Sequence, residues 1–164
     1  NVCAVDPETA KNKDWLEFFS KNGNSAANSI FENWNKSLAK SNVEYVKANT
    51  IDEILSGIDI QKIKLVKIDV EGAEEMVLKG FEKMALINSP ILFEYRIDIM
   101  KRDLSDNGLG MLERFNQSFD LYAIASSKEG QVILAAFDAN KPCANAIAIP
   151  KKDKVNLMSK FQLQ

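Results

Sequence analysis

One strand and the helix expected after it constrain the fold of this chain more than any other feature. Residues 63–70 read IKLVKIDV, a β-branched and mostly apolar run that is typical of a central parallel strand covered on both faces. Gly72 follows at once, and apolar residues then recur on one helical stripe: Ala73, Met76, Val77, Gly80, Phe81 and Met84. The charged residues are expected mainly on the opposite side: Glu74, Glu75, Lys79, Glu82 and Lys83.

Further strands and helices are expected on both sides of this unit. Apolar or alternating runs predict strands at residues 2–5, 15–19, 43–48, 91–95, 121–125, 131–137 and 146–149, and a helix at 107–115. Thr50 and Glu53 form a capping box that predicts a short helix, which Gly57 would stop. Residues 28–40 fit either a loop or a helix. The alternation of strands and helices predicts an α/β fold with a mainly parallel sheet, and the last strands predict a C-terminal antiparallel hairpin.

Composition excludes several classes of function. The chain contains no histidine, which excludes zinc sites with histidine ligands, Ser–His–Asp triads and a histidine general base. Its 21 basic and 23 acidic residues leave no basic footprint, so we expect no nucleic-acid partner. No apolar run is long enough to cross a bilayer and no signal peptide opens the chain, so we expect a cytoplasmic protein without a membrane partner. The lysines at 151, 152 and 154 indicate a solvated tail over 151–164, after a domain spanning 1–150.

The residues around the central strand resemble a known family. Lys67–Glu74 reads KIDVEGAE and Val77–Gly80 reads VLKG, which resembles the signature of FkbM-family methyltransferases at every position. Other family-like segments are Ala4–Asp6, Phe18–Phe19, Asn28–Ile30, Asn49–Leu55 and Pro90–Glu94. The resemblance implies a class I methyltransferase sheet of the Rossmann-like type and S-adenosylmethionine as cofactor.

The resemblance also implies a missing part. Class I methyltransferases hold the methionine end of the cofactor with a glycine loop after the first strand, and bind the ribose through an acid that ends the second. No such loop is present, so the chain resembles an N-terminally truncated, partial methyltransferase domain. Asp6, which precedes Pro7, is one candidate for the ribose acid. We favour an alignment without that role, because too few residues separate Asp6 from Phe18 for a helix and a strand.

Three carboxylates are expected at the catalytic centre. Ligands of open α/β sheets lie beyond the carboxyl ends of the strands, where Asp69, Glu71 and Glu94 are expected. A carboxylate is a sufficient general base for O-methylation, because a sulfonium donor needs little activation. These side chains also suit Mg²⁺ or Ca²⁺, but the resemblance implies no metal and we expect none.

Other residues complete the predicted site. Asp69, Gly72, Asn28 and Ser29 are expected to bind the cofactor, and Glu71, Tyr95 and Arg96 the acceptor. Purely structural roles compete with these assignments: Asp69 as a helix cap, Glu71 as a partner of the helix dipole, and Glu94 as an ion-pair partner of Arg96 or Lys67. We expect Lys67 to neutralise Asp69.

These observations predict an S-adenosylmethionine-dependent methyltransferase that O-methylates a sugar or another hydroxylated small molecule, so a small-molecule or glycan acceptor is the expected partner. The alternative is a truncated or degenerate fold that serves as a non-catalytic binding or interaction module. Surface left uncovered by the truncation predicts self-association.

Overall fold

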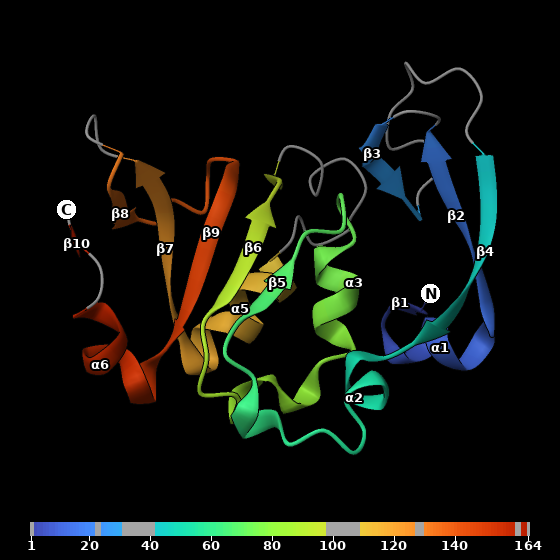
Figure 1. Cartoon of the computed structure of the whole chain (residues 1–164), viewed down its shortest axis with the longest axis horizontal. Helices are drawn as coiled ribbons and strands as arrows, with labels where there is room; N and C mark the ends of the chain where they lie inside the picture. Colours follow the sequence, from blue (N-terminus) through green and yellow to red (C-terminus); the bar gives the residue numbers. More distant parts are fainter. Residues whose placement is uncertain are drawn as a thin grey trace. The chain divides into compact units, whose positions relative to one another are not determined.

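The computed structural model describes residues 2–21, 24–30, 42–97, 109–126, 130–159 and 162–163. They divide into two compact units. Unit 1 comprises Asn1–Ile58 and Val70–Glu82, and unit 2 comprises Asp59–Asp69 and Lys83–Gln164. Each unit has a β-sheet of its own (Figure 1).

Unit 1 contains a four-stranded sheet with the order β1-β4-β2-β3. The strands are β1 (Val2–Ala4), β2 (Trp15–Lys21), β3 (Asn24–Ser29) and β4 (Asn42–Asn49). β1 runs parallel to β4, whereas β2 is antiparallel to both β4 and β3. Val5, Leu16, Val46 and Ala48 form one buried hydrophobic cluster of the unit.

The described residues of unit 1 also form three short helices. α1 (Pro7–Asn12) joins β1 to β2, α2 (Ile51–Ile54) follows β4, and α3 (Glu74–Lys79) contributes Met76 to the core. The capping box at α2 is confirmed: the Thr50 hydroxyl accepts the amide hydrogen of Glu53, and the Glu53 carboxylate accepts that of Thr50. Of the region expected as loop or helix, Asn28 and Ser29 lie in β3, and residues 31–41 lie outside the described residues.

Unit 2 contains a six-stranded sheet with the order β10-β8-β7-β9-β6-β5. Its strands are β5 (Val66–Ile68), β6 (Ile91–Tyr95), β7 (Phe119–Ser126), β8 (Val132–Ala136), β9 (Cys143–Pro150) and β10 (Gln162–Leu163). α5 (Leu109–Ser118) lies across one face, where the ring of Phe115 stacks on that of Phe93 at a centroid distance of 4.6 Å (Figure 1). Shorter helical turns are η1 (Ile60–Lys62), η2 (Glu82–Leu86), η3 (Lys151–Asp153) and α6 (Lys154–Met158).

The fold is mixed α/β, but the expectation of a mainly parallel sheet is not confirmed. In unit 2 only β5–β6 and β8–β10 pair in parallel, while β6–β9, β9–β7 and β7–β8 are antiparallel. The β7–β8 pair is the expected C-terminal hairpin. β9 causes much of the difference, since it is inserted antiparallel between β6 and β7.

The signature strand also differs from its prediction. β5 contains three residues and is an edge strand of its described sheet, and Leu65 before it is 55% exposed. Two charged residues of α3 are buried instead of facing water: Glu74 is 0% and Glu75 is 2% exposed. The prediction of a polar outer side is therefore wrong for these two glutamates.

The described part of the segment after residue 150 contains η3, α6 and β10, and its assignment as a tail separate from the domain stays a prediction. β10 pairs with β8, so this segment completes the sheet of unit 2. Lys154 forms an ion pair with Asp120 at 2.8 Å, and Lys151 donates a hydrogen bond to the carbonyl oxygen of Asn116. Among the described residues, no helix is both long enough and apolar enough to span a membrane.

Candidate functional site

Two of the predicted carboxylates meet at the carboxyl ends of adjacent parallel strands in unit 2. Asp69 directly follows β5, and Glu94 lies near the end of β6. The two strands pair in parallel with Ile68 beside Phe93, which fixes the register. Carboxylate oxygens of Asp69 and Glu94 lie within 4.8 Å of each other. The strands are therefore adjacent and parallel, as predicted.

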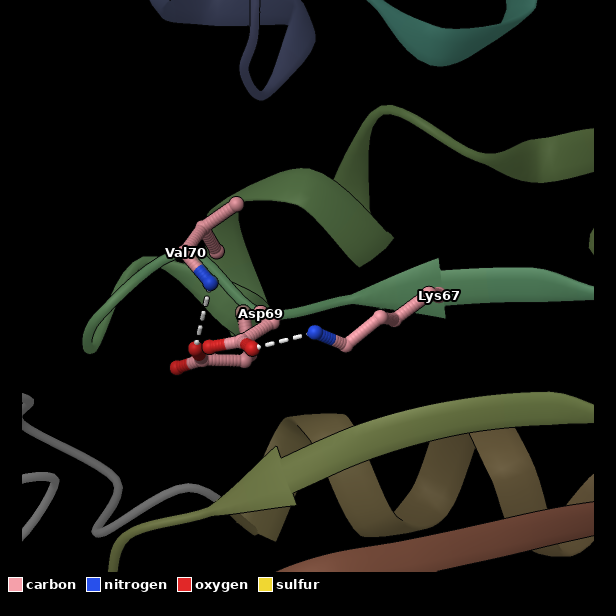
Figure 2. Close-up of polar contacts among 4 residues, drawn as sticks. Lys67, Asp69 and Val70 are labelled. Carbon is pink, nitrogen blue, oxygen red and sulfur yellow. Dashed lines mark hydrogen bonds and ion pairs between the residues drawn. The ribbon is translucent and has the colours of Figure 1, made fainter. Parts of the chain in front are cut away.

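Each of these carboxylates has a cationic partner. The Lys67 ammonium donates a hydrogen bond to Asp69 at 2.7 Å (Figure 2), and Arg96 lies 3.7 Å from Glu94. The hydrogen bond to Asp69, and then the attraction of its charge, raise the pKa of Lys67 above its usual value. Both Lys67 and Asp69 remain exposed to solvent, so this pair is not a buried ion pair.

Asp69 does not cap the following helix. The N-cap residue of α3 is Ala73, which makes no side-chain capping bond. The predicted neutralising role of Lys67 is confirmed, whereas the competing assignment of Asp69 as a helix cap is not seen.

A small notch lies between the two carboxylates. It is lined by Lys67, Ile68, Asp69, Leu92, Phe93, Glu94 and Asn145, and has room for about 10 Å³. That is about the space one water molecule needs. These residues of unit 2 therefore form a polar edge and not an enclosing cavity.

Asn145 was not predicted at this edge. It lies on β9, which is antiparallel to β6, and its side chain is exposed. It is the only polar side chain between Cys143 and Pro150, and this interruption of an apolar run was the available signal.

Glu71 and Gly72 form the turn that opens the second segment of unit 1. Glu71 has a φ of +53° and Gly72 a φ of +98°, so both adopt the left-handed conformation. Gly72 is thus explained by backbone conformation, since a residue with a side chain rarely adopts that φ. Glu71 is partly buried. Its predicted roles in catalysis and acceptor binding stay predictions, as does the predicted role of Gly72 in binding the cofactor.

Tyr95 lies inside unit 2. Its ring is 1% exposed, and its hydroxyl donates a hydrogen bond to the carbonyl oxygen of Ala139 at 2.9 Å. Burial, and then the negative charge of Asp138, raise the pKa of Tyr95. Tyr95 therefore has a packing role, and its contact with an acceptor stays a prediction. Arg96, which follows it, holds Glu94 as described above.

A second polar group lies at the end of the parallel β1–β4 pair in unit 1. The amide of Val5 donates to the carbonyl oxygen of Asn49 at 3.0 Å, which continues the pairing beyond β1. The buried Oδ1 of Asn49 has no hydrogen-bond partner among the described residues. A buried amide oxygen of this kind is costly unless a donor reaches it.

Asp6 lies at the same end and caps α1. Its carboxylate accepts the amide hydrogen of Thr9 at 2.9 Å and the Thr9 hydroxyl hydrogen at 2.7 Å. Partial burial acts to raise the pKa of Asp6, but these hydrogen bonds outweigh it and the pKa is lowered.

We expected too few residues between Asp6 and Phe18 for a helix and a strand, and this expectation is wrong. A six-residue helix, α1, and the start of β2 both fit between Asp6 and Phe18. Asp6 thus follows β1, which has the parallel neighbour β4. The other predicted cofactor residues, Asn28 and Ser29, end β3, and their side chains lie outside the described part of the chain.

Comparison with known protein families identifies the family to which the chain is similar. The family described as the methyltransferase FkbM domain matches residues 6–112, a range that includes Asp6, Asn49, Asp69 and Glu94. No curated protein and no solved structure shows significant similarity to the chain.

Proposed function

Because the chain belongs to the FkbM methyltransferase family, we propose that it transfers a methyl group from S-adenosylmethionine to a hydroxyl oxygen of a sugar or another hydroxylated small molecule. The observation that carries this proposal is the pair of carboxylates, Asp69 and Glu94, at the carboxyl ends of β5 and β6. Ligands of α/β sheets lie at that edge, and carboxylates accept hydrogen bonds from hydroxyl groups.

For this reaction the protein must orient the acceptor toward the cofactor and remove the hydroxyl proton of the acceptor. A sulfonium cofactor supplies a methyl group that is already activated. Asp69, held by Lys67, is suited to accept a hydrogen bond from the acceptor and to fix its orientation. Glu94 or Asp69 would then take the hydroxyl proton while the acceptor oxygen bonds to the methyl carbon and the carbon–sulfur bond breaks, which leaves the sulfur as a neutral thioether.

Unit 1 offers groups that fit the adenosine part of the cofactor. The unpaired Oδ1 of Asn49 suits the amino group of an adenine ring, because that atom is buried and lacks a donor. The Asp6 carboxylate keeps lone pairs beyond those that Thr9 occupies, and these suit the hydroxyls of a ribose. We therefore add Asp6 and Asn49 to the predicted cofactor residues Asp69, Gly72, Asn28 and Ser29.

The remaining parts of the proposal rest on the sequence. Glu71, Tyr95 and Arg96 are proposed to contact the acceptor, and the protein is proposed to act in the cytoplasm.

Binding of S-adenosylmethionine by isothermal titration calorimetry is the first test. We expect a micromolar dissociation constant, which Asn49→Ala weakens about tenfold through the loss of one buried hydrogen bond. Glu113→Gln, which alters an exposed carboxylate on α5, is the matched control and should bind like wild type. No detectable heat with the wild type would instead support a non-catalytic binding module.

Methyl transfer is the second test. Radiolabelled S-adenosylmethionine is incubated with a panel of sugars and other polyols, and the labelled product is counted. For an acceptor that is methylated, Glu94→Gln combined with Asp69→Asn should lower kcat at least about 100-fold by removing the base. Cofactor affinity should change far less, and Glu113→Gln should retain full activity. Undiminished turnover in the double variant would refute the carboxylate chemistry.

A further inference from the structure

The turn after the signature strand contains a residue in an uncommon conformation. Among the described residues, Glu71 is the only one other than glycine with a positive φ. L-residues populate this left-handed region sparsely, and they stay there only where surrounding contacts hold them. The structure must therefore contain a group that fixes the backbone on both sides of Glu71.

Glu74 is that group. It is completely buried, and its Oε1 accepts the amide hydrogen of Val70 at 3.1 Å and that of Gly72 at 3.3 Å. The bond to Val70 is drawn in Figure 2. Val70 and Gly72 flank Glu71 directly, so a single carboxylate oxygen binds the amides on both sides of the left-handed residue.

A backbone hydrogen bond also spans the turn, from the amide of Ala73 to the carbonyl oxygen of Val70 at 3.4 Å. Ala73, at the N-cap position of α3, offers no side-chain capping bond. Successive amides of a left-handed turn form a concave site for an anion, and Glu74 fills it from within the chain. In its ionised form the Glu74 carboxylate accepts these bonds as charge-assisted ones, which are stronger than those to a neutral acceptor.

We propose that Glu74 is a positioning residue, an internal anion that holds Glu71 in its left-handed conformation and so fixes the direction of the Glu71 carboxylate toward the acceptor. The evidence that Glu74 fixes the backbone at Glu71 comes from the hydrogen bonds within unit 1 alone. Only the consequence for the acceptor rests on the proposed function.

Amide hydrogen exchange measured by NMR tests the hydrogen bonds from the Val70 and Gly72 amides to Glu74, and it requires no enzymatic activity. Glu74→Gln keeps the size of the side chain but removes its charge, so the Val70 and Gly72 amides should exchange about tenfold faster than in wild type. Asp52→Asn is the matched control, because the Asp52 carboxylate accepts the amide hydrogen of Glu82, beyond the other end of α3. It should leave Val70 and Gly72 unchanged. Unchanged exchange in Glu74→Gln, or an equal acceleration of all amides in unit 1, would overturn the proposal.

A second variant links Glu74 to the conformation of Glu71. Glycine adopts a positive φ without strain, so Glu71→Gly should restore the thermal midpoint lost in Glu74→Gln, or restore folding if that variant does not fold. The same substitution should not compensate Asp52→Asn. A double variant no more stable than Glu74→Gln alone would show that the two residues are not coupled in this way.

Kinetic measurements on Glu74→Gln can distinguish a failure of the positioning role of Glu74 from a failure of the proposed function. With a methylated acceptor, Glu74→Gln should raise the KM for that acceptor about tenfold while the affinity for S-adenosylmethionine stays within about twofold, a split that general destabilisation would not produce. If the wild type methylates nothing, the proposed function fails, and hydrogen exchange still decides the role of Glu74. If the wild type is active and Glu74→Gln has the same KM and kcat, the positioning role fails and the proposed function stands.

Discussion

Gly80 occupies a position where the surrounding chain leaves no room for a side chain. Its φ is −87°, which any residue adopts, but an added Cβ would lie 2.1 Å from the carbonyl oxygen of Val5 and 3.3 Å from Cβ of Thr50. Gly57 is the opposite case, with a φ of +83° and open space around it. Gly80 therefore lacks a side chain for a steric reason, whereas Gly57 lacks one because of its backbone conformation.

We expect Gly80→Ala to lower the free energy of unfolding by about 1–3 kcal/mol, because the backbone at Val5 must move. Gly57→Ala should cost only about 1 kcal/mol, from the left-handed conformation alone. Urea denaturation monitored by circular dichroism measures both. A smaller loss at Gly80 than at Gly57 would contradict the close contact with Val5.

Asp6 should make stability depend on pH. Because the pKa of Asp6 is lowered below its ordinary value in the folded state, the stabilising contribution of Asp6 is present above that ordinary value and is lost as the pH falls through the folded pKa. Between about pH 6 and about pH 3, the free energy of unfolding of wild type should therefore fall more steeply than that of Asp6→Asn. Thr9→Val, which removes the hydroxyl donor, should lie between the two. Parallel curves for all three proteins would contradict this assignment.

At the scale of one element, α3 is unusual because a helix of six residues buries two adjacent glutamates. Glu74 binds the amides of the preceding turn, as described above. Glu75 forms an ion pair with Lys79 at 2.6 Å, although the contact lacks the angle of a hydrogen bond. Lys79 is half-exposed and ends the helix, where a cation also favours the helix dipole.

Removal of Lys79 should therefore be costly. We expect Lys79→Met to lower the free energy of unfolding by about 1–3 kcal/mol, since it leaves the Glu75 carboxylate buried without a counter-charge. The double variant Glu75→Leu with Lys79→Met should recover most of the loss, because apolar pairs often replace buried ion pairs without penalty. Chemical denaturation of the single and double variants measures this. If the double variant is less stable than Lys79→Met, the Glu75–Lys79 ion pair contributes more to the free energy of unfolding than the apolar packing that replaces it.

At the scale of the whole molecule, one face of the sheet of unit 1 exposes apolar side chains. Trp15 is 60% and Tyr45 is 66% exposed, and Val43 is also exposed. The register places them on one face, since Trp15 pairs with Lys47, two residues from Tyr45 and on the same side of β4. The opposite face carries the buried Leu16, Val46 and Ala48.

We expect this face to associate with a second copy of the chain, because large exposed apolar side chains that share one face promote association. Sedimentation velocity over a range of concentrations should show a concentration-dependent dimer. Trp15→Ser combined with Tyr45→Ser should weaken the dimer at least about tenfold through the loss of apolar burial. Val155→Ser, on α6 of unit 2, removes an exposed apolar side chain elsewhere and is the control. A wild-type monomer at every concentration would refute the prediction.

Local features of the sequence determined several elements of the secondary structure. The strand, turn and helix around residues 66–79, the capping box of Thr50 and Glu53 and the β7–β8 hairpin all follow from residues close together in the chain. Periodicity and short-range hydrogen bonds encode such features directly. The meeting of Asp69 and Glu94 was also predictable, because the carboxyl ends of neighbouring parallel strands share one edge.

The tertiary structure alone decided the rest. Periodicity placed Glu74 and Glu75 on the side opposite the apolar stripe of the helix, yet both are buried, because contacts with polar partners override an amphipathic pattern. Asn145 reaches the site only because β9 is inserted antiparallel beside β6, and Asn49 gains its position from the distant β1. Strand order depends on packing between segments far apart in sequence, which no local pattern specifies.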